Sequence, residues 1–208
     1  IILEGDGRDV VINKGVIDGD ISFGGGDDVY KAQRNKNVTE DGINSVFGGD
    51  GNDRIFGSRN TEYLFGDDGK DLIRTGGGDD IVNGGNGNDK IVAEGVGESF
   101  QTLIGGDGDD VMLNKGGVDT VVIFNGGEGN DRFFGNGNFE IAFYTGAQSD
   151  YEIIQFAPGI LMIRDLRDGQ PDGIDRLKAV DAAEFGGDDS ILILDGLYSS
   201  AAEPDMIG

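Results

Sequence analysis

The chain has 208 residues, and its 40 acidic against 16 basic side chains give a formal net charge of −24. It has neither cysteine nor histidine, which excludes disulfides, thiolate zinc sites and the histidine-based catalytic triads. A chain this acidic is a poor partner for nucleic acid or an anionic membrane, because both require patches of lysine and arginine. No apolar run approaches the roughly 20 residues of a membrane span, and no N-terminal signal peptide is visible.

Many of the 40 glycines recur at fixed spacing in the first two thirds of the chain. The repeated unit is Gly-Gly-x-Gly-x-Asp-x-U-x, where U is a large apolar residue. It is complete at 48–56, 84–92, 105–113 and 126–134, and the copy at 66–74 departs from it only at the second position. Regular glycine spacing with only three prolines indicates a repeat architecture rather than collagen or a disordered tract.

Well-kept and degenerate copies of the unit alternate along the chain. The well-kept copies begin at residues 4, 23, 48, 66, 84, 105 and 126, and the degenerate ones, which contain every insertion, begin at 13, 32, 57, 75, 93, 114 and 135. The predicted structural period is therefore 18 residues, with two units per coil and about seven coils. We call the two resulting sides of the coil the strict side and the relaxed side.

Each position of the unit has a physical role. Glycine at positions one, two and four permits positive φ in a tight turn. A short strand follows at positions seven to nine, and its central apolar side chain points inward because side chains alternate along a strand. We expect the inward residues to be Ile55, Ile73, Ile91, Met112 and Phe133 on one side, and Val46, Leu64, Val82, Phe100 and Val121 on the other. The core is then thin, and it cannot by itself offset the entropy of ordering so many glycines.

The acidic side chain at position six recurs in every well-kept copy. Stacked turns supply carbonyl oxygens and one carboxylate each, an all-oxygen cage that suits Ca²⁺ better than Mg²⁺. The predicted carboxylate ligands of several calcium ions are Asp9, Asp28, Asp53, Asp71, Asp89, Asp110 and Asp131, with Asp80 and Asp119 on the relaxed side. The predicted turn residues of these sites are Gly48, Gly49, Asp50, Gly51, Gly66, Asp68, Gly69, Gly84, Gly85, Asn86, Gly87, Gly105, Gly106, Asp107, Gly108, Gly126, Gly127, Glu128 and Gly129. The alternative, that the acid only forms a turn, is favoured at Asp18, Glu62, Glu98 and Glu140.

The repeat ends near Phe139. We expect strands on either side of a turn at 145–150, a strand at 159–166, an acidic loop at 167–175, a short helix or a strand with a turn at 174–185, and a last strand at 191–197. An open solenoid end must be covered to prevent pairing with other chains. The sequence therefore predicts a calcium-binding roll at 1–138 and a capping region at 139–208. Asp168, Asp172 and Asp175 could add a cation site, although a solvated turn is favoured there.

Residues 4–143 resemble the repeats of the RTX (hemolysin-type calcium-binding) family. Three segments of the cap, 149–153, 171–175 and 175–185, resemble C-terminal regions of such proteins. The resemblance implies an all-β, right-handed parallel β-roll in which position-six aspartates one coil apart share an ion. The implied pairs are Asp9/Asp28, Asp28/Asp53, Asp53/Asp71, Asp71/Asp89, Asp89/Asp110 and Asp110/Asp131, with a bulge from Lys36 to Asp41 in the second pair.

The resemblance also implies a function. It suggests a non-catalytic module of a secreted bacterial protein that folds on meeting extracellular calcium, with the type I secretion machinery and an upstream domain of the same polypeptide as partners. The chain opens inside a repeat, so we expect it to be part of a longer protein. Two alternatives remain: an accessory module of a secreted hydrolase or lyase that binds a glycan or the catalytic domain, and a rigid spacer of an adhesin or surface-layer protein. No carboxylate pair stands out as catalytic, and Tyr30, Tyr63 and Phe65 form no clear series for glycan binding.

Overall fold

The computed structural model describes residues 1–15, 17, 19–32, 44–95 and 97–194. The predictions for Asp18, for the bulge at 36–41 and for residues 195–208 fall outside these described residues, and nothing further is said of them.

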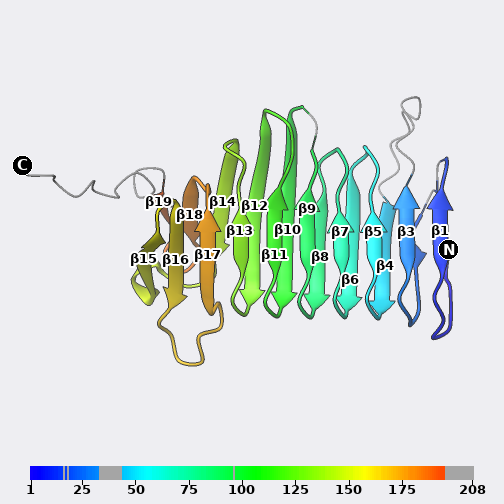
Figure 1. Cartoon of the computed structure of the whole chain (residues 1–208), viewed down its shortest axis with the longest axis horizontal. Coiled ribbons are helices and arrows are strands. Elements are labelled where there is room, and N and C mark those ends of the chain that lie inside the picture. Colours follow the sequence, from blue (N-terminus) through cyan, green and yellow to red (C-terminus); the bar gives the residue numbers. More distant parts are fainter. Residues whose placement is uncertain (16, 18, 33–43, 96, 195–208) are drawn as a thin grey trace, which may run out of the picture.

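Two β-sheets lie against each other along the whole length of the molecule (Figure 1). Within the described residues the first sheet has ten strands in the order β1-β3-β5-β7-β9-β11-β13-β17-β16-β15, and the second has nine in the order β19-β18-β14-β12-β10-β8-β6-β4-β2. From β1 to β14 the odd-numbered strands lie in the first sheet and the even-numbered strands in the second, so two successive strands make one coil of a solenoid. The N-terminus lies at one end of the stack and the strands β15 to β19 lie at the other.

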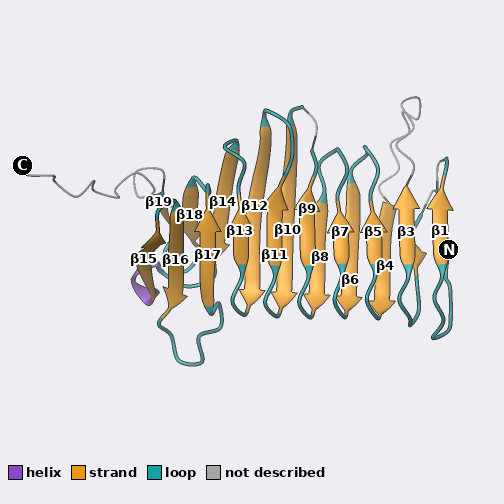
Figure 2. Ribbon diagram, in the orientation of Figure 1, coloured by secondary structure: helices purple, strands orange, loops and turns teal. Residues whose placement is uncertain are grey.

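From β3 to β14 the strands of the first sheet are shorter than those of the second (Figure 2). Their bounds are β1 Val10–Asn13, β2 Ile21–Ser22, β3 Val29–Ala32, β4 Asn44–Asp50, β5 Arg54–Phe56, β6 Glu62–Asp68, β7 Leu72–Arg74, β8 Ile81–Asn86, β9 Lys90–Ala93, β10 Ser99–Asp107, β11 Val111–Asn114, β12 Thr120–Glu128, β13 Arg132–Phe134, β14 Phe139–Tyr144, β15 Tyr151–Ala157, β16 Ile160–Asp165, β17 Ile174–Lys178, β18 Ala182–Phe185 and β19 Ser190–Ile193. The all-β fold class and the parallel roll are confirmed. Seven strand pairs, from β1/β2 to β13/β14, lie within the described residues.

Parallel pairing sets the period of the coils. Residues that face each other on neighbouring coils are 18 apart where no insertion occurs, as for Arg54 and Leu72 or Leu72 and Lys90. The two later steps, from Lys90 to Val111 and from Val111 to Arg132, are 21 residues long. The 18-residue period is therefore the basic coil, and insertions lengthen it without breaking the stack.

The core is a single narrow layer between the sheets. Ile55, Ile73, Ile91, Met112 and Phe133 are fully buried on the first sheet, as the alternation of side chains predicted. Val46, Leu64, Val82, Leu103 and Phe124 are fully buried on the second. At the end nearest the cap the rings of Phe124 and Phe133 stack across the layer with centroids 5.4 Å apart.

Two inward positions were predicted wrongly. Phe100 is 46% exposed and Val121 is half-buried, while Leu103 and Phe124 fill the corresponding core positions. The pairing of Leu103 with both Val82 and Phe124 fixes this register. The physical reason is that each three-residue insertion lies in the relaxed turn before the strand and not after it, so the strand register moves three residues later.

β14 (Phe139–Tyr144), which the sequence analysis placed in the capping region, pairs in parallel with β12 as the last strand of the roll. We therefore use the term cap for residues 145–194. β17 continues the first sheet in parallel with β13, and β18 continues the second in parallel with β14. The hairpin β15–β16 and the strand β19 then pair antiparallel and form the outer edges. The helix that we considered for 174–185 does not form, since β17 and β18 occupy that segment. Within the described residues, no helix is long and apolar enough to cross a membrane.

Candidate metal centre

The strict turns stack through their backbones. The position-four N–H groups of Gly51, Gly69, Gly87 and Gly108 each donate to a position-three carbonyl of the next coil at 2.7 Å. Gly51 shows why this position needs glycine, because its φ is +135° and a Cβ would overlap the Gly26 carbonyl. The imperfect copy keeps the same turn through Asp67, which has a φ of 70° in the left-handed region that aspartate tolerates better than most residues.

The position-six aspartates form one continuous column. The N–H group of each donates to the Oδ1 atom of the aspartate one coil later, at 2.7 or 2.8 Å. The column runs through Asp9, Asp28, Asp53, Asp71, Asp89, Asp110 and Asp131. The structure therefore brings together all seven strict-side aspartates that the sequence singled out, in the order predicted.

The second oxygen of these carboxylates is buried without a polar partner. Among the described residues, the Oδ2 atoms with no hydrogen bond are those of Asp28, Asp53, Asp71, Asp89, Asp110 and Asp131. Each of these residues is at most 2% exposed. A buried carboxylate oxygen with no donor is costly, so a row of six such atoms points to a cation that they bind.

The position-one glycine leaves room for that cation. A Cβ built on Gly84 would overlap both the Asp89 Oδ2 atom and the Gly105 carbonyl oxygen of the next coil. The same pair of oxygens, one carboxylate and one carbonyl, faces Gly48, Gly66 and Gly105. At Gly126 the three nearest atoms all belong to Asp131. Hard cations such as Ca²⁺ prefer carboxylate and carbonyl oxygens, so this donor set fits calcium.

Without a cation, burial opposes ionisation of the column. Desolvation, followed by repulsion from neighbouring carboxylates, raises the pKa of Asp53 to about 6, of Asp71 and Asp131 to about 7 and of Asp110 to about 8. Desolvation likewise raises the pKa of Asp89. Burial therefore favours the binding of protons or metal ions by the carboxylates of the strict side.

The position-three side chains lie outside this column. Asp50, Asp68, Asn86, Asp107 and Glu128 are exposed, and their carbonyls accept the position-four N–H bonds. A second ladder, which sequence reasoning missed, runs through position five. There the side-chain oxygens of Asp27, Asn52, Asn88, Asp109 and Asn130 accept N–H groups from neighbouring coils. Asn or Asp at position five of five well-kept copies, interrupted by Lys70, was its signal in the sequence.

The relaxed side has a broken column. Pairing places Glu62, Asp80, Gln101, Val122 and Glu140 at equivalent positions. Asp80 is buried, but its Oδ1 accepts the Glu62 N–H at 2.9 Å and its Oδ2 accepts the Gln101 Nε2–H at 3.1 Å.

Asp119 does not lie in the relaxed column. It is exposed, and Val122 occupies the equivalent place. The three-residue shift of the insertions also moves Glu98 out of register, where it is exposed.

The cap continues the strict column with an acid that the repeat pattern does not include. The Asp131 N–H donates to the Asp175 Oδ1 at 2.8 Å, and Asp175 is 2% exposed. Burial, then repulsion from Asp131, raises the pKa of Asp175 well above its ordinary value. Gly173 repeats position four, since a Cβ there would overlap the Gly129 carbonyl.

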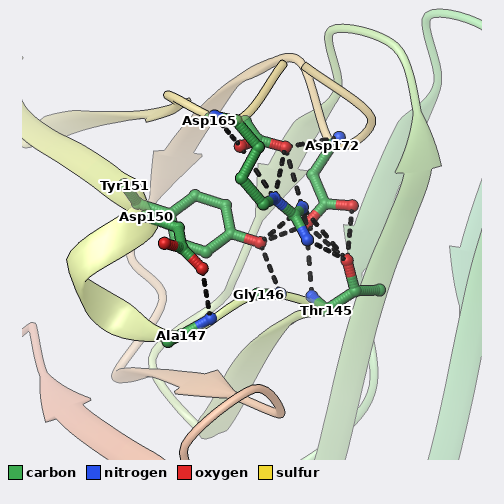
Figure 3. Close-up of polar contacts among 8 residues, drawn as sticks. Thr145, Gly146, Ala147, Asp150, Tyr151, Asp165 and Asp172 are labelled. Carbon is green, nitrogen blue, oxygen red and sulfur yellow. Dashed lines mark hydrogen bonds and ion pairs between the residues drawn. The ribbon is translucent and has the colours of Figure 1, made fainter. Parts of the chain in front are cut away.

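The remaining acids of the 167–175 loop do not gather around an ion (Figure 3). The Asp172 carboxylate accepts hydrogen bonds from the Tyr151 hydroxyl and, at 3.0 Å, from the Thr145 hydroxyl. It also forms an ion pair with Arg167 at 2.8 Å, which pairs in turn with Asp165 at 2.7 Å. Asp168 is exposed. This Arg167 network holds the loop against the hairpin, and only Asp175 joins the strict column.

The fold and the site define the class of protein as a parallel β-solenoid with a column of buried carboxylates between its coils. In the described part of the chain no three acidic side chains converge on one point. One carboxylate oxygen and one carbonyl oxygen approach the space beside each of Gly48, Gly66, Gly84 and Gly105. Comparison with known families agrees with this class. The RTX calcium-binding nonapeptide repeat matches in four copies, at residues 38–73, 57–91, 102–121 and 123–138.

The chain thus carries RTX repeats, and such repeats bind Ca²⁺, several ions per module. No curated protein matches the chain significantly.

Proposed function

We propose that this chain is a calcium-triggered folding module. The observation that carries the proposal is the column of six buried Oδ2 atoms without partners among the described residues. In the absence of cations the roll buries carboxylates next to one another, which is costly in a medium of low dielectric constant. Calcium removes that cost only in the folded state, because the two halves of each site belong to different coils.

The expected calcium affinity makes folding depend on the calcium concentration of the compartment. Extracellular calcium modules bind at about 10⁻⁴ to 10⁻³ M, whereas cytosolic sensors work at about 10⁻⁷ to 10⁻⁵ M. A ligand that binds only the folded state adds roughly 2.7 kcal/mol of stability per site at 100 times its dissociation constant. Several such sites would leave the chain unfolded in the cytosol and folded outside the cell.

RTX repeat proteins are typically secreted by bacteria. We therefore extend the proposal to type I secretion, with this chain supporting the passage and the later stability of a larger polypeptide. The charge of −24 favours an extended chain during passage, because like charges repel. Expression with and without a type I exporter should place the protein in the medium only when the exporter is present, and equal amounts in both cases would contradict the secretion role.

Circular dichroism tests the folding role directly. In EGTA the chain should show a weak β signal, and addition of CaCl₂ at 10 mM should restore it. The same amount of MgCl₂ is the control, because magnesium demands a stricter octahedral geometry and dehydrates reluctantly. A chain that is fully folded in EGTA at neutral pH contradicts calcium-triggered folding.

A second candidate function is favoured by the outer face of the first sheet. Arg54, Lys90, Arg132 and Arg176 are exposed there and lie in one row across the paired strands. Lys31 and Lys178 are exposed on the same sheet. Leu72 and Val111 occupy the intervening places of the row. Neighbouring strands are about 4.8 Å apart, so the basic side chains recur along a line, as the charges of a linear acidic glycan do.

Binding assays separate this candidate from the first. In calcium, the chain should bind chondroitin sulfate but not neutral dextran, and the affinity should fall as salt rises. Lys90→Gln with Arg132→Gln should abolish binding without changing the calcium-dependent folding. Equal binding by the double variant and the wild type contradicts the role of this face.

A further inference from the structure

The last relaxed turn of the roll meets the cap around Glu140. Glu140 lies in β14 and is 0% exposed. Its Oε1 atom accepts hydrogen bonds from Asn114 Nδ2 at 2.7 Å and from the Asn136 N–H at 3.0 Å. Its Oε2 atom is buried and has no hydrogen-bond partner among the described residues. This glutamate therefore has one oxygen fixed by donors and one oxygen free for another ligand.

The free oxygen faces the same kind of space as the strict aspartates do. A Cβ built on Gly135 would overlap the Ala179 carbonyl oxygen and lie 2.8 Å from Glu140 Oε2. Gly135 thus leaves open a space that one carboxylate oxygen of the roll and one carbonyl oxygen of the cap approach together. Gly84, with Asp89 Oδ2 and the Gly105 carbonyl, has the same arrangement on the strict side.

The cap supplies a second acid to this place. The Glu140 N–H donates to Asp181 Oδ2 at 2.6 Å, and the Asp181 N–H donates to the Glu140 carbonyl at 2.9 Å. Ala179 has a φ of 54° although it is not glycine. Such a conformation is unfavourable for a residue other than glycine and tends to occur at functional sites. The segment that presents the carbonyl and Asp181 is therefore held in one unusual conformation.

The other glutamate of the relaxed column provides a contrast. Glu62 also lies beside a glycine, Gly57, and a carbonyl of the next coil, that of Thr75. Its Oε2 atom, however, accepts the Ser58 N–H. The two oxygens of Asp80 are likewise bound by Glu62 and Gln101. Hydrogen bonds therefore satisfy the Glu62–Asp80 pair, whereas the Glu140–Asp181 pair keeps a buried oxygen without a donor.

We propose that Glu140, the carbonyl of Ala179 and Asp181 form a calcium site that joins the last coil to the cap. This site lies outside the matched repeats, which end at residue 138, and it deepens the proposed calcium-triggered folding. All of its donors are oxygens, as hard cations require. Because Glu140 belongs to the roll and the other two donors belong to the cap, an ion here binds only when the cap is docked.

Calcium stoichiometry and hydrogen exchange test the site together. Glu140→Gln keeps the size of the side chain and a carbonyl oxygen that can accept from Asn114 and Asn136. This variant should bind one calcium ion fewer than the wild type by isothermal titration calorimetry. In saturating calcium, amide exchange in β17 and β18 should also become about tenfold faster, because the cap loses its ion. Glu152→Gln is the control, since Glu152 is exposed and pairs only with Arg164 in the described hairpin.

The outcomes separate this proposal from the one on which it rests. An unchanged stoichiometry in Glu140→Gln overturns the junction site while the calcium-triggered folding stands. A wild type that takes up no calcium overturns both. If Glu140→Gln fails to fold, Asp181→Asn, which changes a half-exposed residue, replaces it with the same expectation.

A crystal grown in CaCl₂ gives an independent check. It should show an ion about 2.3–2.6 Å from Glu140 Oε2 and the Ala179 oxygen. A water molecule there, or a direct hydrogen bond to Glu140 Oε2, overturns the site.

Discussion

The strict and relaxed sides of each coil share a backbone turn but differ at position six. On the strict side every described coil has aspartate there, and each Oδ1 atom accepts the N–H of the coil before. On the relaxed side the same place is filled in turn by Glu62, Asp80, Gln101, Val122 and Glu140. The three-residue insertions of the described coils also fall only on the relaxed side. The residue at position six is therefore uniform on the strict side and variable on the relaxed side.

This difference is explained by the geometry that a cation shared between two coils requires. A cation between two coils needs a carboxylate and a carbonyl at a fixed height, so each strict turn is constrained by both of its neighbours. Gln101 and Val122 are neutral, and their turns need only close the coil. Loop-closure entropy grows slowly with length, so three extra residues are tolerated wherever no ion is shared.

The largest expected effect comes from filling the space beside position one. In Gly84→Ala the new Cβ would overlap Asp89 Oδ2 and the Gly105 carbonyl. The backbone must therefore shift to make room for it. We expect a loss of more than about 4 kcal/mol of stability in calcium, within the range that marks severe substitutions. Gly117→Ala on the relaxed side is the control, because its nearest atoms lie at 3.8 Å. Chemical denaturation in 10 mM CaCl₂ measures both, and similar losses would contradict the two-sided comparison.

The next effect comes from removing one charge and keeping the shape. Asp89→Asn retains an oxygen for the Asp71 N–H but presents a neutral group to the cation. We expect the chain to bind at least one calcium ion fewer and to lose roughly 3 kcal/mol in saturating calcium. Glu62→Gln is the matched change on the relaxed side. The Glu62 Oε2 atom already accepts the Ser58 N–H, unlike the Oδ2 atoms of the strict column, so calcium binding should hardly change. Equal effects in calorimetry would show that the sides do not differ.

The pH dependence of the calcium-free chain gives a smaller effect. The pKa values of Asp71 and Asp110, about 7 and about 8, lie above the ordinary value of 3.8, chiefly through burial. Between the ordinary value and these raised values, the folded chain binds more protons than the unfolded chain. The free energy of unfolding therefore falls as pH rises through this range. In EGTA, the β signal should be stronger at pH 5 than at pH 8.

Two comparisons test this explanation of the pH effect. Asp110→Asn should reduce the slope by up to about 1.4 kcal/mol per pH unit, which corresponds to one proton. Saturating calcium should flatten the slope further, because bound ions keep the carboxylates charged. A calcium-free chain that becomes more stable towards pH 8 would contradict the buried column.

Sequence alone predicted the strict side well and the relaxed side poorly. Glycine and aspartate at fixed spacing determine the strict turns, so the inward positions of Ile55, Ile73 and Ile91 followed from alternation. The insertions at 93–104 and 114–125 left the register open. Both Phe100 and Leu103 are apolar, as are Val121 and Phe124, so hydrophobicity did not show where the three extra residues lie.

The contacts between roll and cap could not be predicted for a different reason. Asp175 meets Asp131 across 44 residues, and Asp181 meets Glu140 across 41. No repeat spacing connects these acids, because the β15–β16 hairpin intervenes. Only the tertiary arrangement brings the cap segments into parallel register with β13 and β14.

The smallest expected effect tests the corrected register. Asp119 was predicted as a ligand, but it is exposed while Val122 takes the place in the column. Asp119→Asn should therefore leave calcium stoichiometry unchanged and alter stability by less than about 0.5 kcal/mol, as surface substitutions usually do. Asn retains the positive φ of 67° found at this position, so the substitution removes only the charge. Calorimetric calcium titrations of Asp119→Asn and Asp110→Asn compare an exposed with a buried carboxylate nine residues apart. If Asp119→Asn bound one calcium ion fewer, Asp119 rather than Val122 would have to occupy the column position. The relaxed side would then bind calcium as the strict side does.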